Sequence, residues 1–236
     1  MGRRSLSYSH QSARDEKCGV VTAVGTTQNN DLPEDLIPIV DKSIENTGEK
    51  HENITADCGF CNYEILKKVE EEREEEFYIP DRRFSASQKE WKNQYSIDKF
   101  TMNEAGEYEC PAGNPMEYKR TVSYEDGHSV DIYEGVGCSS CPLKGECTKG
   151  EKRHINIDSR IFYRDIMRDK LKSDKGRGIY MKRQGLIEPV HGDDQKNKGW
   201  IQHHLRGYNK ASALVFTYKD CYESVVDGET QEKRDS

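Results

Sequence analysis

The sequence has no long apolar run, and this excludes one broad class of protein. No stretch approaches the roughly 18 apolar residues that a membrane helix requires. The first residues, Met1 to Ser5, lack the apolar segment of a secretory signal peptide. Hydrophobic residues make up only 33% of the 236 residues, and charged residues another 33%. We therefore expect a cytoplasmic protein with one or two modest cores, a polar surface and no membrane partner.

The chain has eight cysteines, which in a protein without a secretion signal more often stay reduced or bind metal than form disulfides. Four of them follow one pattern: a lone cysteine, then a Cys-x2-Cys, then a cysteine six residues later. Four thiolates at this spacing can close a tetrahedral Zn²⁺ site, although four reduced thiols in a polar loop, or less readily an iron–sulfur cluster, also fit. The four are Cys110, Cys138, Cys141 and Cys147.

A second Cys-x2-Cys, Cys58 and Cys61, lies near an expected helix N-terminus, where thiol pKa values fall. A redox motif is one interpretation. Incidental cysteines are the interpretation that we favour, because Cys58 falls inside a signature discussed below.

The formal net charge of −7 conceals a basic segment. From Lys149 to Lys210 there are sixteen Lys/Arg against eight Asp/Glu, so this segment carries +8 and the remainder −15. Scattered basic residues usually form a solvated helical face. A clustered basic segment instead favours contacts with nucleic-acid phosphates.

The N-terminal part predicts alternating strands and helices. Residues 19–24 are β-branched and suit a strand, followed by a turn over Gly25 to Asp31 and a helix carrying Leu36, Val40 and Ile44. A strand ending at Asp57, a helix over residues 62–75 and a strand at 77–79 come next. This order predicts βαβ units with a parallel or mixed sheet, whose C-terminal strand ends bind ligands.

The pattern changes at residue 81 to short Gly- and Tyr-bearing segments, which we interpret as an insertion. After it we expect a helix over residues 161–171, a loop over Lys172 to Gly178, and a helix from Ile187 to Lys196 with Pro189 in its first turn. We therefore expect four divisions. Residues 1–80 form a partial core, and residues 81–150 form the cysteine-bearing insertion. Residues 151–222 form a basic helical part of the core, and residues 223–236 form a polar tail.

Two separated motifs carry a family resemblance. The first motif is Ala56-Asp57-Cys-Gly-Phe60 and extends to Glu64. The second motif runs from Tyr180 through Arg183 and Glu188 to Gly192. It continues with the segments Asn197 to Trp200 and Leu205 to Gly207. In this order they resemble the second-aspartate and glutamate segments of the DDE transposases of bacterial insertion sequences. The resemblance extends from about Tyr8 to Asn209.

The resemblance implies an α/β fold: an RNase H-like mixed sheet with flanking helices, interrupted by the cysteine-bearing insertion. It also implies two-metal chemistry with Mg²⁺ or Mn²⁺, for which Asp57 and Glu188 are the expected catalytic ligands. The implied partners are transposon-end and target DNA and a second copy of the chain, with no small-molecule substrate. Expected contacts to DNA phosphate are Tyr180, Arg183, Lys196, Lys198 and Arg206, with Lys182 nearby and Trp200 and Tyr208 available to stack.

The chain departs from the family pattern at several positions. The family's first aspartate would precede Met1, so the chain resembles the C-terminal part of a transposase. The nearby carboxylates that could replace it are Asp15 and Asp31. The resemblance places Asp15 on a later strand and Asp31 in a turn. The family's lysine seven residues after the glutamate is Gln195 here, with Lys196 beside it. Charged or polar residues also stand at family positions that are usually apolar or uncharged, namely His191, Asp193 and Asp194.

Three hypotheses follow. The first is a transposase that cleaves DNA and transfers strands, as a truncated copy. The second is an inactive fragment that binds DNA or inhibits the full-length enzyme. The third is a zinc-binding interaction module. His203 and His204 are adjacent, and we interpret them as an exposed pair rather than as ligands.

Overall fold

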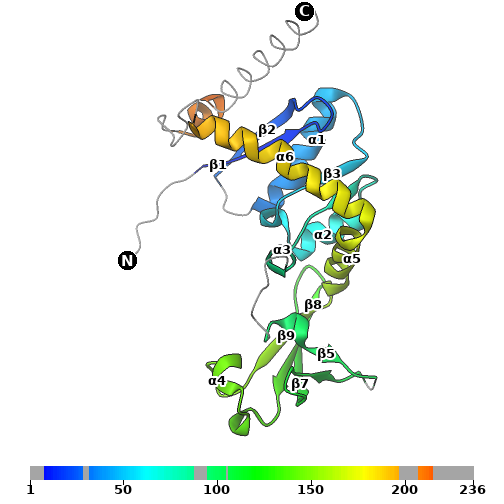
Figure 1. Cartoon of the computed structure of the whole chain (residues 1–236), viewed down its shortest axis with the longest axis vertical. Helices are drawn as coiled ribbons and strands as arrows, with labels where there is room; N and C mark the ends of the chain where they lie inside the picture. Colours follow the sequence, from blue (N-terminus) through cyan, green and yellow to red (C-terminus); the bar gives the residue numbers. More distant parts are fainter. Residues whose placement is uncertain (1–7, 29–31, 88–94, 105, 197–206, 215–236) are drawn as a thin grey trace, which may run out of the picture. The chain divides into compact units, whose positions relative to one another are not determined.

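The computed structural model describes residues 8–28, 32–87, 95–104, 106–196 and 207–214. The chain divides into two compact units (Figure 1). Unit 1 combines Met1–Arg82 with Met167–Ser236, and unit 2 is Arg83–Ile166. The chain therefore leaves unit 1, forms unit 2 and returns to complete unit 1.

Unit 1 is built from short strands and longer helices, which confirms the predicted α/β class. Its strands include both an antiparallel and a parallel pair. In chain order its elements are β1 (Ser9–Arg14), β2 (Val21–Thr27), the 3-10 turn η1 (Leu32–Asp35), α1 (Leu36–Thr47), β3 (Asn53–Thr55), the 3-10 turn η2 (Cys58–Phe60), α2 (Tyr63–Glu71), β4 (Glu76–Tyr78), the second half of α5 (Ile161–Lys172), α6 (Asp174–Lys196) and a helical segment at 208–214.

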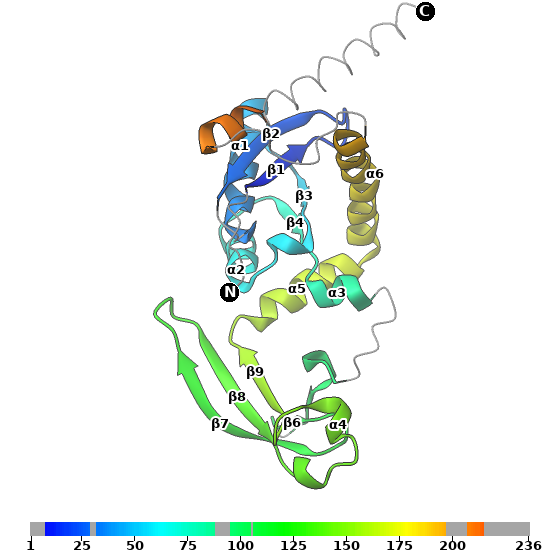
Figure 2. The same cartoon turned by 90° about the vertical axis from the view of Figure 1, so that its left-hand side faces the viewer.

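The hairpin β1–β2 forms the first strand pair. Gly25 pairs with Gln11, so the turn expected from Gly25 is wrong: β2 continues to Thr27 because β1 offers it a hydrogen-bonding partner. Val21 and Val24 are buried on β2, and Ile39 and Val40 are buried on α1. Figures 1 and 2 show α1 on one side of these strands and α6 on the other.

The segment β3–α2–β4 is a βαβ unit, as the sequence predicted, and its two strands are parallel. Asn62 begins α2 as its N-cap, since its side-chain oxygen accepts a hydrogen bond from the Ile65 N–H at 2.7 Å. Ile65, Leu66 and Val69 recur at helical spacing and are buried. This packing fixes the C-terminal end of β3, where Asp57 follows.

The loop predicted over Lys172 to Gly178 is wrong, because α6 begins at Asp174. The Ser173 hydroxyl joins the two helices: it donates to the Lys170 carbonyl at 2.6 Å and accepts from the Gly176 N–H at 3.0 Å. Pro189 consequently lies well inside α6 and not in a first turn. Gly176 and Gly178, which lie in the predicted loop, are instead part of α6.

Unit 2 is a five-stranded antiparallel sheet in the order β5-β6-β7-β8-β9 (Figure 2). Its small core cluster contains Phe100, Met116 and Ile155. The strand β9 pairs with β8, so the sheet extends beyond residue 150. The elements are the end of α3 (Arg82–Ser87), η3 (Ile97–Lys99), β5 (Thr101–Met102), β6 (Tyr108–Glu109), β7 (Pro115–Ser123), β8 (Ser129–Gly135), η4 (Cys138–Ser140), α4 (Lys144–Cys147), β9 (His154–Asp158) and the start of α5.

Within the described ranges, no helix combines the length and the apolar character that crossing a membrane requires.

Candidate active site and cysteine pocket

Asp57 lies two residues after β3 ends at Thr55, near the end of a parallel strand, as the sequence predicted. Its side chain caps η2: Oδ1 accepts a hydrogen bond from the Cys58 N–H at 2.5 Å. The side chain nevertheless remains 57% exposed. One carboxylate oxygen is therefore held by the backbone while the group as a whole faces solvent.

The second signature segment meets Asp57 through Arg183 of α6. Arg183 Nη2 lies 3.6 Å from Asp57 Oδ2, and the Arg183 side chain is 20% exposed. The guanidinium also lies over the Tyr180 ring, 6.0 Å from its centre. The structure thus brings together three residues that the two motifs contribute from distant parts of the sequence.

Tyr180 keeps its proton in this arrangement. Burial raises the pKa of its phenol, the charge of Asp57 raises it further, and Arg183 acts in the opposite direction. Burial also raises the pKa of the Cys58 thiol, with the hydrogen bond to Asp57 next in size. Both groups are therefore neutral hydrogen-bond donors near neutral pH, which removes the main support for a reactive Cys58.

Glu188 lies on α6, five residues beyond Arg183, which corresponds to about 7.5 Å along a helix axis. The backbone just before it is tied to the first strand, since Arg14 Nη1 donates to the Leu186 carbonyl at 2.7 Å. The sequence alone does not predict Arg14 as a residue that supports this helix. No local pattern marks Arg14, because its role depends on a tertiary contact.

The other candidate residues fall in different places. Asp15 lies in the turn after β1, where its carboxylate accepts from the Cys18 N–H at 2.7 Å, and Lys182 pairs with Glu16 at 2.6 Å. Tyr208 donates to the Thr26 carbonyl at 2.9 Å, a packing role. Gln195 and Lys196 end α6. The remaining predicted positions lie outside the described residues, namely Asp31, Lys198, Trp200, His203, His204 and Arg206.

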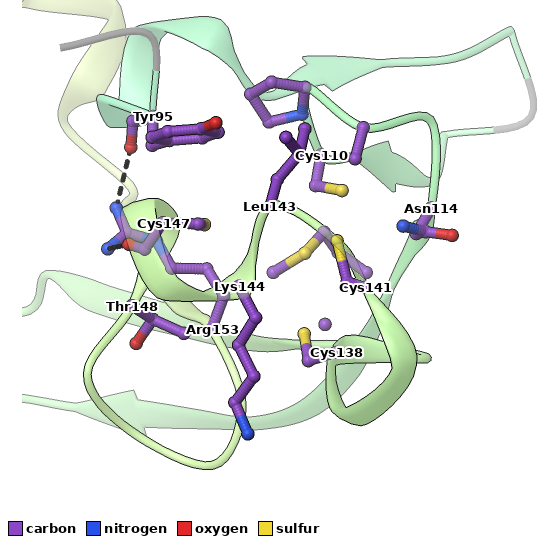
Figure 3. A pocket seen from close by; sticks show the side chains of 14 residues that line it. Tyr95, Cys110, Asn114, Cys138, Cys141, Leu143, Lys144, Cys147, Thr148 and Arg153 are labelled. Atoms are coloured by element: carbon purple, nitrogen blue, oxygen red, sulfur yellow. Dashed lines mark hydrogen bonds between the residues drawn. The ribbon is translucent and has the colours of Figure 1, made fainter.

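The four-cysteine pattern converges on a single pocket of unit 2 (Figure 3). The four cysteines of this pattern form no disulfide with one another or with the other described cysteines. Burial raises the pKa of the Cys147 thiol, Arg153 lowers it, and the other three cysteines raise it. The pocket is lined by all four of these cysteines, and by Tyr95, Met116 and Arg153 among others.

The thiols line the pocket without closing on a common point. Among the described side chains, no three His, Cys, Asp or Glu residues are grouped closely enough to hold a metal ion. Figure 3 shows Cys147 and Cys141 on opposite sides of the pocket in that view.

Comparison with known protein families gives a match over part of the chain. Residues 109–219 match a family model described as a transposase DDE domain. That segment, which is a little less than half of the chain, is similar to the DDE transposase family. No curated protein and no solved structure matches the chain.

The match to the DDE transposase family confirms the resemblance seen in the sequence. The matched segment contains Tyr180, Arg183 and Glu188, together with the four cysteines of the pocket. Asp57 precedes it, so the argument for Asp57 rests on its own motif and on its contact with Arg183. Transposases act on DNA, so the match supports DNA as the partner and a role in DNA transposition.

Proposed function

We propose that this DDE transposase chain cleaves phosphodiester bonds at transposon ends and transfers the strand to target DNA, using a divalent metal. The observation that supports this most strongly is the ion pair between Arg183 and Asp57. It joins the arginine of the glutamate signature to the carboxylate of the aspartate signature, as a shared phosphate and metal site requires.

The residues present fit Mg²⁺ or Mn²⁺. Hard cations at phosphate sites take one or two carboxylates and complete their shell with water and substrate oxygens. The exposed carboxylate of Asp57 suits this role, and Glu188 is the second proposed ligand. When bound, the metal supplies activation of the attacking oxygen and stabilisation of the leaving one.

Arg183 and Tyr180 would bind the scissile phosphate. A guanidinium can donate two hydrogen bonds to phosphate oxygens, and its stacking on Tyr180 fixes its plane. The raised pKa of Tyr180 makes it a hydrogen-bond donor rather than a base. Without DNA, Arg183 pairs with Asp57; with DNA, its charge is shared with the phosphate.

A cleavage assay on end-containing DNA, with Mg²⁺ or Mn²⁺, tests the proposal. Asp57→Asn removes the charge but keeps an oxygen that can accept from the Cys58 N–H, so folding is preserved. We expect this variant and Glu188→Gln to lose cleavage by a factor of about 100 or more. The matched control is Asp169→Asn, which neutralises a carboxylate that is 76% exposed on α5.

Equal cleavage by all four proteins would contradict the assignment of Asp57 and Glu188. Salt-sensitive DNA binding by the wild-type chain without any cleavage would support an inactive DNA-binding form instead.

DNA binding gives a second readout. Each phosphate contact contributes about 0.9 to the slope of log K against log salt, so Arg183→Gln should reduce that slope by about 0.9. Because a transposition reaction joins two ends, we also propose that the active form is a homodimer on paired end DNA. Light scattering of the DNA complex measures its mass, and one chain per two ends would contradict the dimer.

A further inference from the structure

The pocket of unit 2 gathers four thiols from three chain segments around one hollow, with no disulfide among them (Figure 3). Because its cysteines are free and face a common space, the pocket offers the ligand type and number of a structural zinc site. We propose that Cys110, Cys138, Cys141 and Cys147 bind one Zn²⁺ ion that stabilises unit 2. The proposal does not depend on DNA cleavage.

The backbone around the cysteines forms tight turns of the kind that present thiolates to a metal. Cys110 begins one turn, in which the Gly113 N–H donates to the Cys110 carbonyl at 2.8 Å and Gly113 adopts a φ of 75°. Cys138 begins another, in which the Cys141 N–H donates to the Cys138 carbonyl at 3.3 Å. Both turns place a cysteine where the chain reverses.

The Cys138 thiol, in the position that it takes here, leaves no room for a Cβ atom on residue 135. A Cβ atom on Gly135 would lie 2.7 Å from Cys138 Sγ, closer than such contacts ever come. The last residue of β8 therefore leaves room for the Cys138 sulfur to reach the pocket.

The charge around the pocket also favours an anionic centre. Arg153 is partly buried; it donates to the Tyr95 carbonyl at 3.0 Å and its Nε is buried without a partner. No carboxylate forms an ion pair with it within the part of the chain that is described. A partly buried guanidinium without a carboxylate partner favours an anion nearby, and four thiolates around Zn²⁺ carry a net charge of −2 that would offset its charge.

Unit 2 has the limited core that makes a structural metal useful. In β7 only Met116 is buried, and among the described residues the core cluster has three buried members, Phe100, Met116 and Ile155, with partly buried side chains packed against them. Small units with so little buried apolar surface usually rely on disulfides or a metal for stability. Free thiols and a sparse core together favour the metal.

Binding requires the thiols to close on one point. Four thiols release four protons as Zn²⁺ enters, and the Zn–S bonds are about 2.3 Å long. Cys147 ends α4, a helix of only four residues, so we expect this short segment to move and the cysteine side chains to rotate when the ion binds.

The test begins with the full chain expressed with zinc and purified without chelator. We expect one zinc per chain by elemental analysis. We also expect thiolate-to-cobalt absorption bands when Co²⁺ replaces zinc. The variants Cys138→Ser and Cys147→Ser should lose the metal, whereas Cys18→Ser, at an exposed thiol in the β1–β2 turn, should keep it. No zinc in the wild-type chain together with no Co²⁺ bands would overturn the proposal, as would iron in its place.

A second pair of variants leaves every ligand intact, so that loss of folding does not obscure the result. Gly135→Ala places a methyl group against Cys138 Sγ and should weaken zinc retention against a competing chelator by at least tenfold. Gly145→Ala, in α4, has no atom within 4 Å of the new methyl group and should retain zinc like the wild type. Equal retention by both variants would contradict the arrangement, and zinc kept by the cysteine variants would assign it to other ligands.

Discussion

The guanidinium of Arg14, at the end of β1, donates a hydrogen bond to the Leu186 carbonyl in the middle of α6. Pro189 lies three residues further along the helix and has no N–H to give to the carbonyl of Gly185. Arg14 therefore supports the helix backbone beside this interruption, two residues before Glu188. The contact connects the first strand of unit 1 to the helix that carries the proposed metal ligand.

We expect Arg14→Met to lower DNA cleavage by about 10-fold to 100-fold, because a small displacement of a catalytic group has effects of this size. Hydrogen exchange at the amides of residues 186–192 should become faster, which reports the local loosening without relying on activity. Lys172→Met removes the same charge from an exposed ion pair with Asp169 and serves as the control. Identical exchange rates in the two variants would contradict a supporting role for Arg14.

Gly176 is required by the tight connection between α5 and α6. A Cβ atom there would lie 2.0 Å from the Lys170 carbonyl oxygen, whereas a Cβ on Gly178, two residues later in the same helix, would meet nothing within 4 Å. Gly176→Ala should reduce the free energy of unfolding by about 1–3 kcal/mol. Gly178→Ala should raise it by about 0.5–1 kcal/mol, since alanine favours helix. Urea denaturation measures both, and two effects of the same sign would contradict the geometry.

Asp81 and Arg168 form a mostly buried ion pair that fixes α5 to the end of the β4 segment. Arg168 Nε and Nη2 lie 2.6 and 3.0 Å from the two carboxylate oxygens, and both side chains are 14% exposed. Removing one partner leaves a buried charge, so Asp81→Asn should cost about 3–5 kcal/mol of unfolding free energy. In a double-mutant cycle with Arg168→Met, the double variant should lose less unfolding free energy than the two single variants lose in total. Strict additivity would contradict the pairing.

We expect the carboxyl group of Asp158 to make the stability of unit 2 sensitive to acid. Burial alone would raise its pKa, but the hydrogen bonds and charge of Arg160 outweigh burial and hold the pKa below the usual value of 3.8. A lowered pKa in the folded state gives stability that is present above about pH 4 and is lost as the pH falls through the folded-state value. Asp158→Asn should therefore lower stability at neutral pH and flatten its decline below pH 4. Glu125→Gln, at an exposed turn, should leave the acid limb of the denaturation profile unchanged.

The sequence was sufficient to predict β3–α2–β4, because Asn62 and the spacing of Ile65, Leu66 and Val69 are local signals. It also predicted Asp57 and Arg183 as site residues, since each lies in a recognisable motif, and the structure places their charged groups 3.6 Å apart. The start of α6 could not be predicted in the same way. Glycine and serine favour loops on average, and the double hydrogen bonding of Ser173 depends on the end of α5.

The structure of unit 2 could be predicted only in part from the sequence. Its cysteines predicted a shared site, yet its sheet gave little signal because β5 and β6 have two residues each. In β7 almost every residue is exposed, so the alternation that marks a half-buried strand is missing. Pairing with β6 and β8 defines these strands, and pairing is not a local property.

The division of the chain at Arg82 and Met167 has a kinetic consequence for the Asp57–Arg183 contact. During synthesis the segment that carries Asp57 emerges first and cannot meet its partner until the whole of unit 2 has been made. Closing a long unfolded loop has an entropic cost that rises with its length. A unit 2 that folds by itself replaces much of that loop with a compact body and reduces this cost. The rate at which the Asp57–Arg183 contact forms should therefore depend on how early unit 2 folds.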